Sequence, residues 1–258
     1  MSRLLVLLYG AIAYLIFLPT FLYAIAFVAG IAPKHIDAGP AAPLATALAI
    51  DLALLGLFAV QHSGMARPAF KRWWTRFVPV AVERSTYVLV SSLALILLLW
   101  QWQPLPQTVW QVDATPARVA LHALSALGWV LVFTSTFLIN HFDLFGLRQV
   151  WLYANNRSAP ETPFVVRALY RIVRHPLMLG FLIAFWATPG MSVGHLLFAV
   201  ITTGYVLVAV KFLEERDLVA QFGETYRDYQ RRVPMILPIP KRAAETRHPA
   251  AGAPYPRA

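Results

Sequence analysis

The sequence contains no cysteine and few charged residues. Only 13% of its 258 residues are Asp, Glu, Lys or Arg, against roughly 25% in soluble domains. The absence of cysteine excludes thiolate zinc sites, iron–sulfur clusters and cysteine nucleophiles, so a metal would need His and carboxylate ligands, and we predict no metal site. Hydrophobic residues make up 59% of the chain, and its mean hydropathy is +0.59. This composition excludes a disulfide scaffold and a disordered protein, and it indicates an integral membrane protein.

The apolar residues fall into six runs bounded by proline, glycine and charged residues. In chain order the runs are Leu4–Gly30, Pro43–Ser63, Thr86–Trp102, Arg118–Ile139, Pro176–Thr188 and Val193–Leu213. The fifth run is shorter than the roughly 20 residues that a spanning helix needs. It predicts one arm of a tight hairpin, bent at Pro189-Gly190. We therefore predict an all-α, polytopic membrane helix bundle of about six segments.

The basic residues are distributed unevenly along the chain. The formal net charge is +10, and all 22 Lys and Arg residues except Lys34 and Arg118 fall on one side of the predicted spans. Lys and Arg concentrate in cytoplasmic loops, so this side is cytoplasmic. The pattern predicts an inner (cytoplasmic) membrane protein with both termini in the cytoplasm. Its basic residues can contact anionic lipids. Nothing in the pattern requires nucleic acid, and it does not specify an oligomeric state.

The end of the chain differs in composition from the rest. Residues 241–258 are rich in Ala, Pro and charge without periodicity, which predicts a disordered tail. Residues 1–240 are predicted to form a single membrane domain.

Polar residues gather at the cytoplasmic ends of the predicted spans. The clusters are Gln61–Pro68, Glu83–Tyr87, Asn140–Gln149 and a longer C-terminal set between Arg167 and Pro234. Polar groups at membrane helix ends are costly, which makes each cluster a candidate for function.

The C-terminal set has an ordered motif. It runs Arg174-His175-Pro176, Gly180, Glu214-Glu215-Arg216-Asp217, Phe222-Gly223-Glu224, Tyr226, Tyr229 and Val233-Pro234. Over about Val165–Pro238 this order resembles the cofactor-binding module of the isoprenylcysteine carboxyl methyltransferase and phospholipid methyltransferase superfamily. The resemblance implies a C-terminal cytoplasmic cap that binds S-adenosylmethionine. Met178 stands where that family usually has Tyr, so an aromatic contact is not expected there.

The resemblance assigns the cofactor to Arg174, His175, Pro176, Gly180, Glu214, Glu215, Tyr226 and Tyr229. S-adenosylmethionine has an ammonium, a carboxylate and an adenine, so its pocket needs an acid, a base and apolar walls. Glu214 or Glu215 suits the ammonium, and Arg174 or the helix start after Pro176 suits the carboxylate. The alternative is that the charged residues form a salt-bridged belt at the membrane interface.

The other clusters carry further motifs. They are Leu57-Phe58-Ala59-Val60-Gln61-His62-Ser63, Glu83-Arg84-Ser85-Thr86-Tyr87 and Asn140-His141-Phe142-Asp143-Leu144-Phe145-Gly146-Leu147-Arg148-Gln149. These motifs look like the methanethiol S-methyltransferase family, bacterial membrane enzymes that make dimethyl sulfide. The segments His62-Ser63 and Met65-Ala66-Arg67 are also similar to NnrU-like membrane proteins. The resemblance implies that a small volatile thiol is methylated. The alternatives are another thiol, a prenylcysteine carboxylate or a phospholipid amine as acceptor, and an NnrU-like protein without turnover.

Methylation of a thiol requires the loss of its proton, which calls for a base or a positive field. His62 and His141 are the candidate bases, and Arg84 and Asp143 the residues that orient them or tune the field. The predicted substrate side consists of Ser63, Glu83, Tyr87, Asn140, Arg148 and Gln149. For each His, the alternative is a structural hydrogen bond at a helix end.

Overall fold

The protein was analysed as a computed structural model, which describes residues 2–40, 42–158 and 164–239. The predicted tail at 241–258 lies outside these residues. The first half of the chain forms α1 (Arg3–Val28), α2 (Leu44–Ala66), α3 (Pro68–Trp74), α4 (Val80–Gln101) and β1 (Thr108–Gln111). The centre forms α5 (Thr115–Ile139), α6 (His141–Leu144), α7 (Leu147–Ala154) and the 3₁₀ turn η1 (Ala168–Arg171). The last part forms α8 (Pro176–Trp186), β2 (Gly190–Ser192), α9 (Val193–Ala209), the π turn η2 (Val210–Glu214), α10 (Glu215–Phe222) and α11 (Glu224–Arg232).

The expectation of an all-α membrane bundle is confirmed. Within the described residues, five helical segments are long and apolar enough to cross a membrane: α1, α2, α4, α5 and the continuous segment Val193–Phe222. The predicted short fifth segment is α8, whose 11 residues extend only about 16 Å at 1.5 Å per residue. It precedes α9 in a hairpin, as the Pro189-Gly190 bend predicts.

Several helix boundaries differ from the apolar runs. The third run was expected to begin at Thr86, but α4 begins at Val80, directly after its N-cap Pro79. Likewise α2 continues beyond Ser63 to Ala66, and the last span continues through η2 into α10. Hydropathy marks where the membrane ends, whereas polar helix formers extend a helix beyond that edge. Glu83 and Arg84 therefore lie inside a helix rather than ahead of one.

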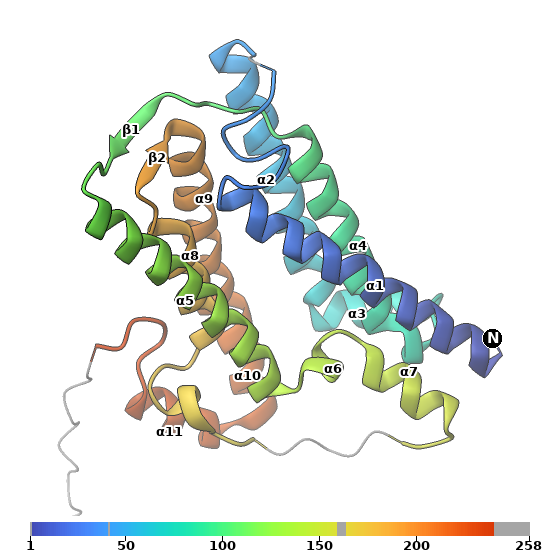
Figure 1. Ribbon diagram of the computed structural model, residues 1–258. Coiled ribbons are helices and arrows are strands. Elements are labelled where there is room, and N and C mark those ends of the chain that lie inside the picture. The colour runs from blue at the N-terminus through green and yellow to red at the C-terminus, as the bar shows by residue number, and fades with distance from the viewer. Residues whose placement is uncertain (1, 41, 159–163, 240–258) are drawn as a thin grey trace, which may run out of the picture.

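The bundle has two sides, which Figure 1 separates clearly. The helices α1, α2 and α4 pack together on one side, and on the other α5 packs against α8, which in turn contacts α9. The contact between α5 and α8 is close because glycines face each other there: a Cβ on Gly180 would lie 2.7 Å from the carbonyl oxygen of Gly128. Small residues allow this approach between membrane helices.

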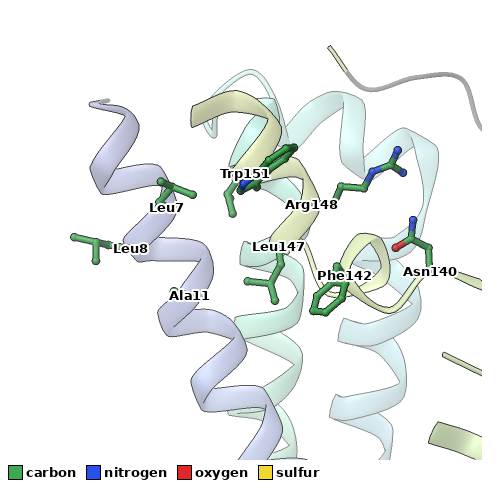
Figure 2. Close-up of a pocket in the computed structure, with 9 residues that line it drawn as sticks. Leu7, Leu8, Ala11, Asn140, Phe142, Leu147, Arg148 and Trp151 are labelled. Atoms are coloured by element: carbon green, nitrogen blue, oxygen red, sulfur yellow. The ribbon is translucent and has the colours of Figure 1, made fainter. Parts of the chain in front are cut away.

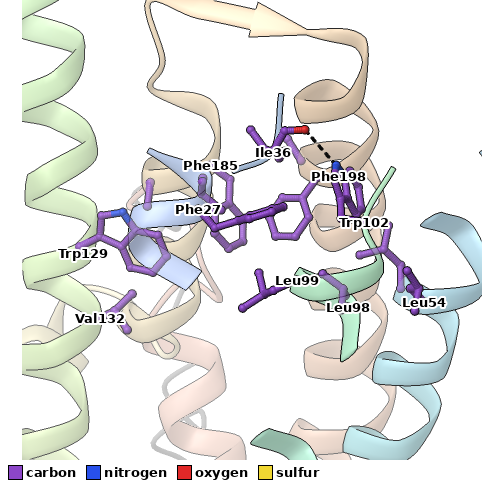
Figure 3. Close-up of a cluster of buried hydrophobic side chains, with 14 residues drawn as sticks. Phe27, Ile36, Leu54, Leu98, Leu99, Trp102, Trp129, Val132, Phe185 and Phe198 are labelled. Atoms are coloured by element: carbon purple, nitrogen blue, oxygen red, sulfur yellow. Dashed lines mark hydrogen bonds between the residues drawn. The ribbon is translucent and has the colours of Figure 1, made fainter. Parts of the chain in front are cut away.

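A hydrophobic core joins the two sides. Phe27, Trp102, Trp129, Phe185 and Phe198 pack with aliphatic side chains in one buried cluster (Figure 3). The indole nitrogen of Trp102 donates a hydrogen bond of 3.0 Å to the carbonyl oxygen of Ile36. This polar group is therefore satisfied within an apolar core. The core lies toward the end of the bundle that carries the loop after α1 and the two strands.

A two-stranded antiparallel sheet is the feature that the sequence did not predict. Trp110 of β1 pairs with Met191 of β2, and Gln111 pairs with Gly190. The pair fixes the α4–α5 connection to the tip of the α8–α9 hairpin. The polar clusters lie at the opposite end of the bundle, where α6, α10 and α11 are seen in Figure 1.

Candidate active site

His62 near the end of α2 faces Tyr87 of α4. The Tyr87 hydroxyl lies 2.9 Å from Nε2 and 3.1 Å from Nδ1 of the imidazole. One hydroxyl cannot align with both nitrogens, so one nitrogen of His62 is left for a further partner. The ring of Phe58 stacks on His62, with centroids 5.2 Å apart, and the Arg84 guanidinium lies 4.9 Å from the Tyr87 ring centroid. The first and second polar clusters thus meet at His62 and Tyr87, where one imidazole nitrogen can accept or donate a further hydrogen bond.

Tyr205 of α9 completes this group and was missed in the sequence. Its hydroxyl lies 3.0 Å from the Ser63 hydroxyl. Beside it, the Gln61 amide nitrogen lies 3.2 Å from Ser91 Oγ, while the buried Gln61 Oε1 has no hydrogen-bond partner. A tyrosine hydroxyl in the middle of the last apolar run was the signal that could have identified Tyr205.

Arg67 connects the first cluster to the C-terminal one. Its Nη1 lies 2.9 Å from Asp217 Oδ2 of α10, and its Nε donates a 3.1 Å hydrogen bond to the Ser63 carbonyl. Glu83, in the first turn of α4, lies near Lys71 of α3. Burial lowers the pKa of Lys71, and the Glu83 carboxylate opposes that shift.

The third cluster forms a tight turn that is braced against α4. Arg84 Nε donates a 2.7 Å hydrogen bond to the Leu144 carbonyl, and Ser85 Oγ donates one of 3.3 Å to the Gly146 carbonyl. Gly146 has φ +85°, and a Cβ there would lie 2.6 Å from Ser85 Oγ. Only glycine fits this position, both in conformation and in space.

Asp143 is the centre of this turn. Its carboxylate accepts hydrogen bonds from Arg148 Nη1 at 3.1 Å and from Gln149 Nε2 at 2.9 Å. The Asn140 side chain accepts from the Asp143 backbone N–H at 3.3 Å. Asn140 has φ +145°, an unusual conformation for a residue other than glycine. The four predicted residues Asn140, Asp143, Arg148 and Gln149 therefore do come together, and they hold one another.

His141 is in a different situation from His62. Its Nε2 lies 2.8 Å from the Tyr14 hydroxyl, and its Nδ1 lies 2.9 Å from Thr136 Oγ1. Phe137 stacks on the ring at a centroid distance of 4.3 Å. Burial lowers the pKa of His141, which keeps the ring neutral. With both nitrogens occupied, His141 links α1, α5 and α6, which favours the structural alternative for this residue.

In the C-terminal module, Arg174, His175 and Glu215 form a buried charged group. Arg174 Nε lies 2.6 Å from Glu215 Oε1, and His175 Nε2 lies 3.2 Å from the same oxygen. Arg174 also donates to the carbonyls of Gln230 and Val233, at 3.1 and 2.5 Å. Burial by itself lowers the pKa of His175, but the carboxylates of Glu214 and Glu215 outweigh it and raise the pKa to about 9. His175 is therefore protonated at neutral pH.

The side chain of the adjacent residue Glu214 points toward the surface. Its side chain is 46% exposed, whereas that of Glu215 is 10% exposed. Glu214 contacts His175 Nδ1 at 3.5 Å. It ends the π turn η2, and such turns often occur at functional sites because they shift the helical register. Of the two glutamates, Glu215 is thus buried in an ion pair, and Glu214 presents its carboxylate at the surface.

Tyr226 and Tyr229 pack around a residue that the sequence did not single out, Phe164. The ring centroids of the two tyrosines lie 5.7 and 5.3 Å from that of Phe164. Tyr229 donates a 2.5 Å hydrogen bond to the Tyr170 carbonyl, whereas the buried Tyr226 hydroxyl has no partner. Burial raises the pKa of Tyr226, which stays protonated. Its hydroxyl is therefore a donor and acceptor ready for a ligand atom.

Pro176 occupies the first turn of α8, as the sequence predicts. The packing of α8 against α5 accounts for Gly180, so its place in a cofactor pocket stays a prediction. A hollow of about 350 Å³ lies beside Glu215, lined also by Lys211, Arg227 and Gln230 among others. Over residues 2–40, 42–158 and 164–239, no group of three or more His, Asp and Glu side chains is placed to hold a metal ion.

Comparison with known proteins identifies the family. The protein family described as "NnrU protein" matches residues 52–249, which include all four polar clusters. The chain belongs to the NnrU family. No solved structure matches this NnrU family member.

This NnrU family chain has relatives over nearly its whole length. It is 58% identical to Methanethiol S-methyltransferase of Mycobacterium tuberculosis, across 94% of this chain and 99% of that protein. It is 54% identical to Methanethiol S-methyltransferase 2 of Bradyrhizobium diazoefficiens, across 92% and 91%. It is also 33% identical to Nurim of Sus scrofa, across 66% and 68%.

Proposed function

We propose that this protein methylates methanethiol to dimethyl sulfide, with S-adenosylmethionine as methyl donor, at the cytoplasmic face of the inner membrane. The observation that carries the proposal is the 58% identity, over 94% of this chain, to a relative named for that reaction. The distribution of Lys and Arg supports the orientation, because basic residues concentrate in cytoplasmic loops and here they gather on the side of the termini and the four polar clusters.

The C-terminal module fits the donor in its chemistry. The exposed Glu214 carboxylate suits the ammonium. Arg174, His175 and Glu215 form a buried charged group beneath Glu214, and His175 contacts the Glu214 carboxylate. The unpartnered Tyr226 hydroxyl is a buried polar atom that a ligand can satisfy. When bound, S-adenosylmethionine supplies a methyl group on a sulfonium that a thiolate can attack.

The His62 group is assigned to the acceptor. A thiol loses its proton as its sulfur bonds to the methyl carbon, and the bond from that carbon to the sulfonium sulfur would break, with S-adenosylhomocysteine as the leaving group. His62 takes the proton at the ring nitrogen that Tyr87 leaves open. Tyr87 orients the imidazole, and Tyr205, whose hydroxyl is bonded to Ser63, lies near Tyr87. Arg84, which lies over the Tyr87 ring, adds positive charge that favours the thiolate.

The assay for the proposal is headspace gas chromatography of the purified, detergent-solubilised protein with S-adenosylmethionine and methanethiol. We expect dimethyl sulfide from the wild type and a strong loss in Glu214→Gln. The matched control is Glu224→Gln, which removes an exposed carboxylate that pairs with Arg227 and Arg231 on α11. It should retain activity.

Binding of S-adenosylmethionine by isothermal titration separates the alternatives. Binding without dimethyl sulfide would overturn methanethiol as the acceptor and direct the search to other thiols, prenylcysteine carboxylates or phospholipid amines. If the protein neither binds S-adenosylmethionine nor forms dimethyl sulfide, the enzymatic proposal as a whole is contradicted.

A further inference from the structure

A groove between α1 and the α6–α7 turn lies beside the turn centred on Asp143. Its volume is about 720 Å³, within the range of roughly 300–1,000 Å³ that is usual for ligand pockets. Its lining consists of Leu7, Leu8, Ala11, Asn140, Phe142, Leu147, Arg148, Val150 and Trp151. Figure 2 shows Leu7 and Ala11 on α1 across from Leu147 and Trp151 on α7. The walls of the groove are therefore mostly apolar.

The floor of the groove is a close contact between α1 and α7. A Cβ on Gly10 would lie 2.6 Å from Cγ2 of Val150, so glycine allows the two helices to meet there. Above this floor the walls are open: Leu8, Phe142 and Trp151 are each about half exposed. In a membrane, such a concave and apolar surface faces lipid.

Two arginines lie near the end of the groove where α1 begins and α7 ends. The Arg157 guanidinium lies 5.3 Å from the centroid of the Trp151 ring, and Arg3 donates a 2.6 Å hydrogen bond to Asn156 Oδ1 just beyond α7. Arg148 contributes a third cation from the wall, although it is paired with Asp143. Arg3 and Arg157 are exposed to the surface. No acidic residue is among those that line the groove.

We propose that this groove binds one phospholipid with an anionic headgroup. Its acyl chain occupies the apolar walls, and its phosphate contacts Arg3 and Arg157. Basic pockets between membrane helices on the cytoplasmic side are suited to such headgroups, and arginine binds phosphate oxygens through two parallel hydrogen bonds. The positive charge of Arg3 and Arg157 favours a lipid with net negative charge over one with none. It also decides against a small apolar thiol, which needs no cations.

The groove adjoins the candidate active site and shares two residues with it. Arg148 and Asn140 belong both to the groove and to the turn centred on Asp143. A lipid in the groove covers the outer side of that turn. The proposal does not depend on the methyltransferase activity, because it concerns lipid binding alone.

The test is native mass spectrometry of the full-length protein, released from vesicles that contain equal amounts of phosphatidylglycerol and phosphatidylcholine with the same acyl chains. We expect one retained phosphatidylglycerol per protein. The double variant Arg3→Gln/Arg157→Gln should weaken its retention about tenfold or more, since each juxtamembrane arginine contributes to the binding of anionic lipid. The matched control, Arg72→Gln/Arg76→Gln, removes the same charge from the region of α3 and should retain the lipid.

A second variant tests the location independently of charge. Ala11→Phe places a larger side chain in the groove, so it should lower the retained phosphatidylglycerol while the arginines stay in place. Equal retention of the two lipids by the wild type would overturn the proposal. So would an equal loss in the two double variants, which would indicate general attraction to anionic membranes, or full retention by Ala11→Phe.

Discussion

His62 and His141 have similar sequence contexts, but the structure gives them different surroundings. Each lies at a polar helix end and next to aromatic residues. His141 is bonded at both nitrogens, by Tyr14 and Thr136, whereas His62 has one hydroxyl partner for two nitrogens. A histidine whose hydrogen bonds are all satisfied within the protein holds helices together. One with a nitrogen to spare can accept a substrate proton.

The largest effect is expected from His62→Ala. Loss of a general base typically costs about 100-fold or more in rate, so kcat should fall by that factor while binding of S-adenosylmethionine is unchanged. Steady-state formation of dimethyl sulfide and titration of the cofactor measure the two quantities. Wild-type kcat in this variant would remove His62 from the mechanism.

His141→Ala should mainly affect stability. It removes the His141 partner of the part-buried Tyr14 hydroxyl, while the Thr136 hydroxyl keeps its bond to the Phe133 carbonyl. One unsatisfied buried group costs about 1–3 kcal/mol. Thermal unfolding in detergent should show a lower midpoint, with kcat per folded molecule within a few-fold of wild type. If instead kcat fell as far as in His62→Ala with no loss of stability, the distinction between the two histidines would be wrong.

Tyr205→Phe tests whether the acceptor group extends to α9. Removal of its hydrogen bond to Ser63 should lower kcat about fivefold, since one bond to a positioned group contributes about 1 kcal/mol, and should shift the pH profile. The control on the same helix is Thr203→Val, which removes a 2.9 Å bond to Trp186. A role in helix packing alone would give the two variants the same small loss of stability and an unchanged pH profile.

The last prediction concerns the protonation of His175, which affects stability rather than activity. The folded protein raises its pKa from 6.5 to about 9. The protonated ring therefore stabilises the fold fully below pH 6.5, and this stabilisation is lost as the pH rises through about 9. The unfolding midpoint of the wild type should fall between pH 7 and 10 by more than that of His175→Gln. If the unfolding midpoints of the two proteins changed with pH in parallel, His175 would not be protonated in the folded protein.

The spans and the short α8 could be predicted because hydropathy and proline positions are local properties of the sequence. The start of α4 could not, since the polar residues from Glu83 onward extend the helix past the apolar run. The pairing of β1 with β2 joins segments that are far apart in the chain, with no motif in either. Sequence position cannot separate inward from outward glutamates, because the π turn before α10 decides which carboxylate is buried.

The same limit applies to the candidate site. The four clusters could be identified as polar helix ends, but their connections depend on packing. Tyr205 reaches Ser63 only because α9 lies against α2, and Phe164 reaches Tyr226 from a segment without regular structure. In the sequence, Phe164 is one aromatic residue of a polar loop, and the only signal for Tyr205 is a hydroxyl within an apolar run.

The most direct test of the account follows the methyl group itself. The protein is given methanethiol and S-adenosylmethionine with a deuterated methyl group, and the headspace is analysed by mass spectrometry for wild type, His62→Ala and His141→Ala. The account predicts dimethyl sulfide with one deuterated and one ordinary methyl group from the wild type and from folded His141→Ala, and very little from His62→Ala. Unlabelled dimethyl sulfide, or none from a wild type that binds the cofactor, would contradict it.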